Sequence, residues 1–176
     1  AVNPANRLQE FEALIARTHK NGLKLLIDIV PNHIARKYEG KNNPKGVKDF
    51  GAEDNISVEY DRNNNFYYIP EQQFQVPTSD DYRPLNGESN PLIDGKFEEY
   101  PAKWTGNGSR LAKPDINDWY ETVKVNYGIR PDGSKDFPEL PNGFEKKSYK
   151  EHFDFWKDKD VPSSWKKFRD IALYWT

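Results

Sequence analysis

Residues 23–30, Leu-Lys-Leu-Leu-Ile-Asp-Ile-Val, constrain this 176-residue chain more than any other stretch. The run is almost continuously apolar and rich in branched side chains, which is typical of a strand buried on both faces of a parallel sheet. Pro31 ends the run, because proline has no N–H to give to a strand ladder. Asn32 and His33 follow at the carboxyl end of this predicted strand, where parallel α/β folds keep their functional sites.

The residues before this run predict an amphipathic helix. Apolar side chains recur there with a helical period, at Leu8, Phe11, Leu14 and Ile15. Asn6 is the predicted N-cap, with Gln9 as its partner in a capping box. Gly22 suits the left-handed residue that ends many helices. A helix, a tight turn, a buried strand and a polar loop together form half of a βαβ unit.

The composition indicates a folded but loop-rich chain. Hydrophobic residues make up 35% and glycine adds 11 residues, which is less than the roughly 45–50% apolar content of typical domains. Aromatic residues at 14% argue against disorder, because disordered chains are poor in them. The chain has no methionine, so we expect a processed product or a piece of a larger protein.

Charge and hydropathy exclude several classes of partner. The net charge is −2 with no basic block, which argues against nucleic acid and anionic membrane surfaces as partners. No apolar run approaches the roughly 18 residues that span a bilayer. The absence of cysteine excludes disulfides but leaves the cellular compartment open, with an extracytoplasmic location as one option.

Shorter elements are predicted further along the chain. Residues 58–60 and 65–69 read as strands around a turn, and residues 73–76 alternate and could pair with them in a small antiparallel sheet. Residues 77–101 are dense in turn formers and predict a long loop. Three helices are expected afterwards: from Asn117 or Asp118 to Gly128, over residues 148–157, and from Ser163 or Ser164 with an apolar stripe of Trp165, Phe168, Ile171, Ala172 and Trp175.

Two stretches carry a resemblance to a known family. Residues 18–24 and 28–33 match a helix ending in His-x-x-Gly followed by a strand ending in Asp-x-Val-x-Asn-His, and this pattern resembles the first signature region of the α-amylase family of glycoside hydrolases. Residues 113–117, Lys-Pro-Asp-Ile-Asn, resemble the short Leu-Pro-Asp-Leu-Asn motif of that family, with Lys113 in place of the usual apolar residue or glutamine. The two matches occur in the order and at the spacing that the family shows.

The resemblance implies an α/β fold, namely a piece of a (β/α)₈ TIM barrel with a loop-rich α+β insert after the third strand. Residues 1–38 would be a barrel segment of helix and parallel strand. Residues 39–161 would be the inserted B domain, with a small antiparallel sheet and short helices. Residues 162–176 would be the next barrel helix. A whole barrel of this kind has about 250 residues, so the rest of the barrel would be a partner of this chain.

Four residues are candidate site residues through the resemblance. His33 matches a histidine that contacts the sugar beside the scissile bond, and Asp28 matches a carboxylate that orients groups near the catalytic centre. Asn32 matches a ligand of a structural Ca²⁺ in many members, and an amide oxygen suits that hard cation. Asn117 stands where many Ca²⁺-binding members have Asp, whereas other members keep Asn and lack the ion.

The residues themselves leave structural alternatives open. His33 could be a structural histidine at a strand end, Asp28 a buried carboxylate satisfied by the backbone or an arginine, and Asn32 a turn residue after Pro31. Four aromatic side chains could either stack on sugar rings or pack in a core: Trp104, Trp119, Tyr67 and Tyr68.

The resemblance implies retaining chemistry on α-glucosidic bonds of starch-like or maltooligosaccharide substrates, with one carboxylate as nucleophile and a second as general acid. The family motifs that carry these carboxylates do not occur in this chain, so we expect the chain to be inactive alone. The alternatives are a non-catalytic carbohydrate-binding or scaffolding member of the family, and a transglycosylase. We also expect self-association of the isolated chain, because residues 23–30 and the stripe on the last helix would expose apolar surface.

Overall fold

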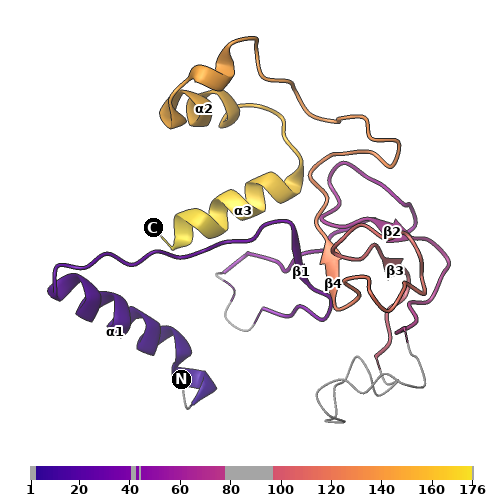
Figure 1. The fold of residues 1–176 in the computed structure, drawn as a ribbon, viewed down its shortest axis with the longest axis horizontal. Helices are drawn as coiled ribbons and strands as arrows, with labels where there is room; N and C mark the ends of the chain where they lie inside the picture. Colours follow the sequence, from indigo (N-terminus) through magenta and orange to yellow (C-terminus); the bar gives the residue numbers. More distant parts are fainter. Residues whose placement is uncertain (1–2, 41–42, 44, 78–96, 176) are drawn as a thin grey trace. The chain divides into compact units, whose positions relative to one another are not determined.

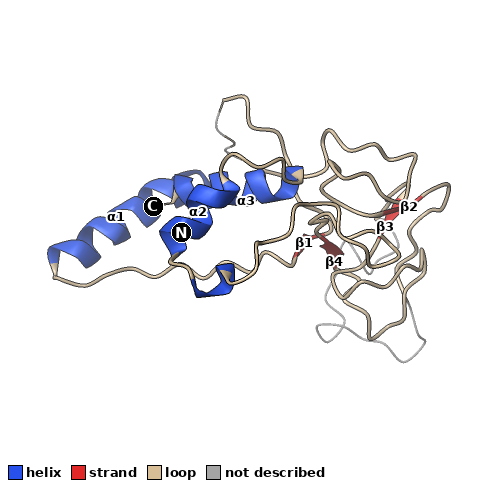
Figure 2. Ribbon diagram, turned by 90° about the horizontal axis from the view of Figure 1, so that it is seen from above, coloured by secondary structure: helices blue, strands red, loops and turns tan. Residues whose placement is uncertain are grey.

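A computed structural model describes residues 3–40, 43, 45–77 and 97–175 of the chain. The chain divides into two compact units, Ala1–Val30 and Pro31–Thr176, and each is described here by itself. Most of the second unit is loop, with short helices and strands at intervals (Figure 2). Of the long loop expected over residues 77–101, residues 78–96 lie outside the described part.

The first unit contains the predicted helix, α1 (Arg7–Lys20), after a 3₁₀ turn η1 (Pro4–Asn6). Its end is confirmed: Gly22 has φ 71° and donates to the carbonyl of His19, while the N–H of Leu23 reaches the carbonyl of Thr18. These two bonds form a Schellman motif. The predicted capping box is wrong, because Asn6 belongs to the 3₁₀ turn with ψ 5° and its side chain makes no cap bond.

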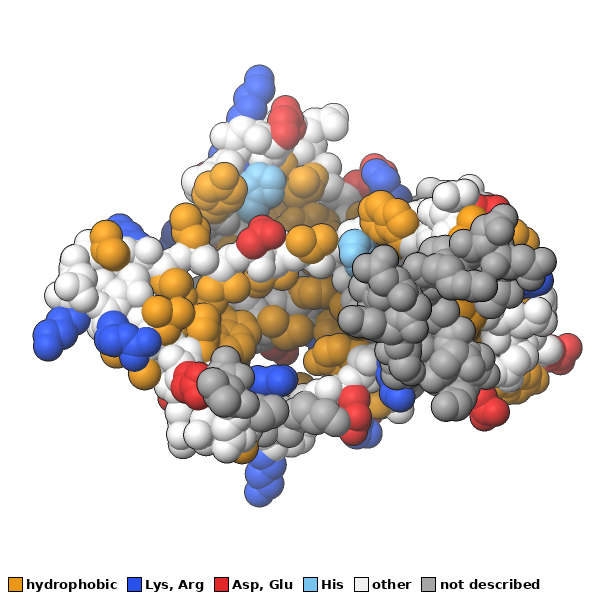
Figure 3. Space-filling view, turned by 60° about the horizontal axis from the view of Figure 1, so that its bottom comes forward, with side chains coloured by type: hydrophobic (Ala, Val, Ile, Leu, Met, Phe, Trp, Pro, Cys, Tyr) orange, Lys and Arg blue, Asp and Glu red, His pale blue; other side chains and the backbone are white. Residues whose placement is uncertain are grey.

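The predicted buried strand over residues 23–30 does not form in this structure. The segment is extended but has no ladder partner among the described residues, and most of its side chains are exposed. Leu26 is 96% exposed and Leu23 63%, and apolar side chains are visible across the face shown in Figure 3. A parallel strand needs neighbours to accept and donate its backbone hydrogen bonds, and no described residues supply them here.

Two small antiparallel sheets organise the second unit. Strand β1 (His33–Ala35) pairs with β4 (Thr122–Lys124), and β2 (Tyr68–Ile69) pairs with β3 (Ala102–Lys103) (Figure 1). The register of the first sheet places His33 opposite Lys124 and Ala35 opposite Thr122. The prediction of a small antiparallel sheet around residues 65–69 is confirmed, but its partner is β3 and not residues 58–60 or 73–76.

The helix predicted from Asn117 or Asp118 to Gly128 is wrong, because β4 occupies this stretch. Val123 and Val125 are each only 1% exposed, so burial alternates with a period of two along residues 122–125. Branched side chains at alternate positions fit a strand better than a helix.

The core of the second unit consists of two neighbouring aromatic clusters. In the larger one, the rings of Tyr67 and Trp104 stack at 4.3 Å between centroids. The smaller one combines Phe66, Tyr68 and Val123 with the half-buried Ile34 of β1. The β1–β4 sheet therefore contributes Ile34 and Val123 to the smaller cluster, whereas both residues of β2 are buried, one in each cluster.

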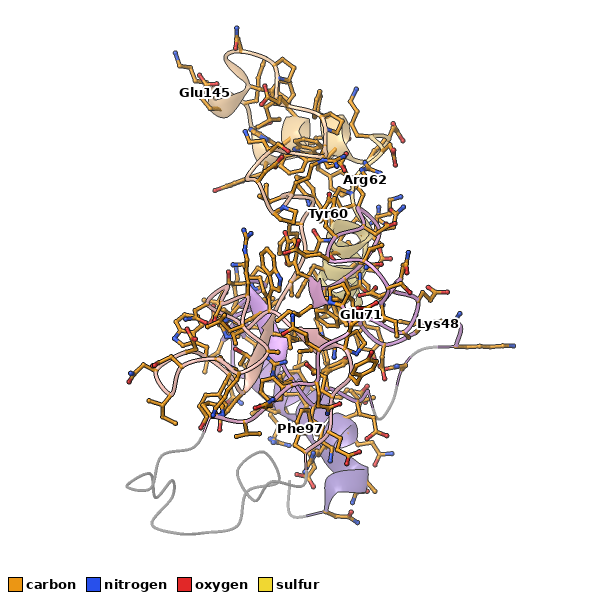
Figure 4. The ribbon with its side chains drawn as sticks, turned by 90° about the vertical axis from the view of Figure 1, so that its right-hand side faces the viewer. Lys48, Tyr60, Arg62, Glu71, Phe97 and Glu145 are labelled. Carbon is orange, nitrogen blue, oxygen red and sulfur yellow. The ribbon has the colours of Figure 1, made fainter. Side chains whose placement is uncertain are left out.

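A polar network fastens the turn at residues 129–136 to the core. Asp136 accepts hydrogen bonds from the Tyr60 hydroxyl at 3.1 Å and from Arg130 at 2.6 Å, and its carbonyl accepts from Arg62. Tyr60 and Arg62 are labelled in Figure 4. Partial burial and the neighbouring Asp136 carboxylate raise the pKa of Tyr60 to about 12. The phenol therefore stays protonated and keeps donating at neutral pH.

The two predicted helices near the end of the chain are confirmed as α2 (Tyr149–Trp156) and α3 (Ser163–Tyr174). The 3₁₀ turn η3 (Phe144–Lys146) precedes them. Ser148 and Glu151 form a complete capping box at the start of α2. The expected serine cap of α3 is wrong, because Pro162 is the N-cap and Ser163 donates instead to the carbonyl of Asn63. In the described part of the chain, no helix is both long and apolar enough to cross a membrane.

The barrel itself stays a prediction. The described residues contain three α-helices and two two-stranded antiparallel sheets, and they close no barrel. The two compact units meet between Val30 and Pro31, and the expected boundary between barrel segment and insert at residue 38 stays a prediction. β1 pairs with a strand from the predicted insert, so His33 belongs with residues 31–176 in this structure.

Candidate functional site

The outer face of the β1–β4 sheet carries His33 and Lys124, which stand opposite one another. Gly106 packs closely on this face, because a Cβ there would come within 2.1 Å of the Thr122 hydroxyl oxygen and 3.2 Å of the His33 Cβ. The Gly106 N–H donates to the Thr122 carbonyl at 3.1 Å. Only glycine permits this approach, so Gly106 fixes the loop that borders His33.

Asn32 orients the imidazole of His33. The Asn32 Oδ1 accepts a hydrogen bond from Lys124 Nζ at 2.5 Å, so the other end of the amide must be the NH₂ group. That NH₂ donates to the Gly106 carbonyl at 3.1 Å and lies 3.0 Å from His33 Nδ1. His33 Nδ1 therefore accepts, and the proton of the neutral ring sits on Nε2.

Trp119 lies beside His33, and hydrogen bonds hold the backbone of Trp119 in place. Its ring meets the imidazole edge-on, with 5.2 Å between centroids and 66° between planes. The Trp119 carbonyl accepts from Thr122 through both the backbone N–H at 3.1 Å and the hydroxyl at 2.9 Å. The indole nevertheless remains 52% exposed.

These residues border an open pocket of about 430 Å³, which we call the His33 pocket. Its lining is His33, Asp118, Trp119, Tyr120, Glu121 and Thr122. An imidazole, a half-exposed indole and two carboxyl side chains are thus gathered from two segments that lie far apart in the sequence. Such a mixture of one aromatic surface with several polar groups suits a polar ligand that also has an apolar face.

The turn before Trp119 is held by its own acidic residues. Asp118 accepts from Asn107 Nδ2 at 2.7 Å and from the Asp115 N–H at 2.9 Å. The bond from Asn107 is the main reason that the pKa of Asp118 lies below its usual range. Asp115 in turn accepts from both the N–H and the side-chain NH₂ of Asn117, each at 2.9 Å. These bonds hold in place the turn that carries Asp118 and Trp119 of the His33 pocket.

Arg36, which no sequence motif singles out, supports the backbone that lines the His33 pocket. Its side chain is completely buried, pairs with Glu99, and lies over the Phe74 ring at 4.0 Å. Its Nε donates to the Tyr120 carbonyl at 2.7 Å, and its Nη2 donates to the Thr122 carbonyl at 3.3 Å. Burial lowers the pKa of Arg36 and the Glu99 carboxylate opposes that shift, so the guanidinium stays charged at neutral pH.

Asn32 does not fit a calcium ion in this arrangement, whereas Asn117 as a calcium ligand stays a prediction. The Asn32 oxygen already accepts from the Lys124 ammonium, which repels a cation. Asn117 uses its backbone N–H and side-chain NH₂ to bind Asp115, which serves the turn. Within the described part of the chain, no three His, Cys, Asp or Glu side chains are close enough together to hold a metal.

The structure brings together some of the predicted site residues. His33 and Asn32 are in direct contact, and Asn117 lies in the turn that leads to Trp119. Asp28 belongs to the first unit, where it is exposed, so the interpretation as a buried carboxylate is wrong for this structure. It is exposed because the surrounding segment has no paired strands among the described residues to cover it.

The four aromatic candidates divide clearly. Tyr67, Tyr68 and Trp104 are 4%, 2% and 7% exposed, and all three belong to the core clusters. The structural interpretation is therefore confirmed for these three. Trp119 alone of the four stays accessible to a ligand.

Sequence reasoning missed Thr122, Lys124 and Gly106, which shape the site. The period-two pattern of residues 122–125 could have revealed β4, and a strand there would have placed Thr122 and Lys124 on one face. The partner of that strand, β1, is too distant in sequence for any local pattern to indicate it.

Comparison of the chain with protein-family models, with curated proteins and with solved structures finds no match. A functional interpretation therefore rests on the chemistry of the His33 pocket and on the motifs that border it. The first motif contributes Asn32 and His33, and the second, residues 113–117, leads into the turn before Trp119.

Proposed function

We propose that the chain is part of a retaining glycoside hydrolase of the α-amylase family, acting on α-glucosidic bonds of starch-like or maltooligosaccharide substrates. In this proposal the chain supplies His33 as a substrate-contacting group and a wall of the active-site cleft. The catalytic carboxylates come from elsewhere in the parent protein. The observation that carries the proposal is the pairing of His33 with Trp119 in one open pocket.

The geometry of His33 supports contact with a sugar. A sugar hydroxyl can either donate or accept a hydrogen bond. A side chain whose own role as donor or acceptor is fixed therefore selects one orientation of that hydroxyl. Asn32 fixes the Nε2–H tautomer of His33 and thereby presets a donor for a substrate oxygen. The preset ring requires no reorganisation on binding, which favours a tight and oriented contact.

The Asp118 carboxylate of the pocket is poorly suited to act as the general acid. A general acid must be protonated at working pH, which requires a raised pKa. Asp118 has a lowered pKa, because it accepts hydrogen bonds from Asn107 and from the Asp115 N–H. The lowered pKa of Asp118 supports the proposal that the general acid lies elsewhere in the parent protein.

The exposed run at residues 23–30 supports a barrel as partner. Six of its eight residues are apolar, with Lys24 and Asp28 as the polar ones, and leaving such a segment in water is unfavourable. Strands from the rest of the parent protein would satisfy its backbone and cover its side chains. In the isolated chain, pairing between two copies would serve the same need.

Two other functions remain candidates. A non-catalytic member of the family would bind or scaffold carbohydrate through the same pocket but would lack the carboxylates elsewhere. A transglycosylase would have the same carboxylates and transfer the glycosyl group to a sugar instead of water. Product analysis with and without a sugar acceptor separates the transglycosylase from the hydrolase.

The reading frame around the chain tests the proposal. We expect a strand that ends in Arg-x-Asp within roughly 15 residues after position 176, because a short loop and one strand of about five residues fit that distance. Purified to homogeneity, the 176-residue chain should not release sugar from maltooligosaccharides. Absence of such an Asp, with no acidic residue at the end of the following strand, would favour the non-catalytic function.

A further inference from the structure

Trp119 differs from the other aromatic side chains of the candidate set in combining exposure with a fixed position. Its indole is 52% exposed, whereas Trp104 is 7% exposed and stacked on Tyr67. A large apolar ring left half in water is unfavourable for the isolated protein. Its position at the edge of the His33 pocket means that a ligand in the pocket can cover it.

The backbone around Trp119 restricts where the ring can go. Its N–H donates to Asn107 Oδ1 at 3.3 Å, and its carbonyl accepts two bonds from Thr122 and one from Gly106 at 3.4 Å. His33 packs against one side of the ring. An aromatic side chain has only two rotatable bonds, so holding it in this way leaves little entropy to lose on binding.

A hexose in its chair form has an apolar face of C–H groups and a rim of hydroxyls. The apolar face can cover an indole, and the hydroxyls need donors and acceptors around its edge. The His33 pocket offers both, because His33 lies against the Trp119 ring and the exposed Glu121 is among the residues that line the pocket. The pocket volume of about 430 Å³ is sufficient for more than one small ring.

We propose that Trp119 is a stacking platform for one glucosyl ring of an oligosaccharide that also contacts His33. The inference rests on the proposed function for the identity of the sugar. Trp119 is thus a substrate-positioning residue, distinct from the groups that break the bond. Trp119 determines where the oligosaccharide lies along the wall of the cleft.

The test measures sugar binding by calorimetry and by saturation-transfer NMR, using the protein encoded by the complete reading frame with its expected nucleophile Asp replaced by Asn to prevent cleavage. Maltoheptaose supplies α-1,4 linkages and cellohexaose supplies β-1,4 linkages. The variants are Trp119→Ala, the ring-preserving Trp119→Phe, and Tyr149→Ala as a control that removes an aromatic side chain 96% exposed on α2. Melting curves check the fold, and we expect Trp119→Ala to shift the midpoint by less than about 4 °C, because half of the indole is already in water.

We expect wild type to bind maltoheptaose, Trp119→Ala to bind about tenfold more weakly, and Trp119→Phe to retain most of the affinity. Tyr149→Ala should bind like wild type. Equal affinity of wild type and Trp119→Ala for maltoheptaose would overturn the platform while leaving the proposed function intact. Binding of cellohexaose alone, lost in Trp119→Ala, would keep the platform and overturn the α-glucan function. Failure of wild type to bind either sugar would overturn both.

Discussion

Replacing Arg36 by methionine should be among the most destabilising changes in the second unit. The substitution keeps a long side chain over Phe74 but removes the charge that pairs with Glu99. The side chains of this pair are 0% and 6% exposed, so the change leaves a carboxylate buried without its main partner. The carbonyls of Tyr120 and Thr122 each lose the hydrogen bond from Arg36 at the same time.

The size of the effect follows from burial. Removing one partner of a buried ion pair costs about 3–5 kcal/mol. Lys103 Nζ lies 3.0 Å from the other oxygen of Glu99 and retains part of the compensation. We therefore expect a loss of about 3 kcal/mol, which is a large fraction of the roughly 5–15 kcal/mol stability of a typical domain.

Urea unfolding followed by tryptophan fluorescence measures this loss. Lys48→Met is the matched control, because Lys48 pairs with Glu53 at the surface with side chains 61% and 67% exposed. An exposed pair contributes less than about 1 kcal/mol. If Arg36→Met and Lys48→Met lower the free energy of unfolding by the same amount, the argument from burial is wrong.

Three further changes test local features. Glu71, labelled in Figure 4, has φ 61°, so Glu71→Gly should raise stability by about 0.5–1 kcal/mol in the same urea assay, and a loss would contradict the strain argument. Gly106→Ala should lower stability by about 1–3 kcal/mol, because the new Cβ would lie 2.1 Å from the Thr122 hydroxyl, and an unchanged midpoint would show that the loop can move away. Hydrogen bonds from the Ser148 backbone and hydroxyl, then from Lys147, lower the pKa of Glu151 to about 2. A lowered carboxyl pKa means that the stabilisation is present above the ordinary value near 4.5 and is lost as pH falls toward 2, so an NMR titration of Glu151 with a midpoint near 4.5 would contradict the capping box.

The helices could be predicted because their signals are local. Gly22 ends α1 in the left-handed conformation that its sequence position suggested, and Ser148 with Glu151 begins α2. Each of these features depends on residues within four positions of one another. Sequence patterns record such neighbours directly.

The strands could not be predicted in the same way, because pairing depends on distant residues. Residues 23–30 have the composition of a buried strand, yet they stay unpaired among the described residues. Residues 122–124 form a strand because β1 pairs with them across a long sequence separation. Propensity alone does not decide such cases, since the same segment is stable only with its partner in place.

The candidate site was predicted in part. The motif at residues 28–33 drew attention to Asn32 and His33, which do lie together, whereas the network that orients them requires Lys124 and Gly106. These two residues come from segments that only the folded chain brings near His33. The exposure of Trp119 likewise follows from packing, because its residue type alone is equally compatible with a core position.

The kinetic effect of His33→Ala in the protein encoded by the complete reading frame tests the central claim most directly. The proposal predicts that kcat/KM for maltoheptaose falls at least tenfold, which corresponds to about 1.4 kcal/mol of lost transition-state stabilisation. The melting temperature should change little, because the imidazole is only partly buried and β1 is held by its backbone. An unchanged kcat/KM in a folded variant would show that His33 does not contact the substrate and would contradict the account.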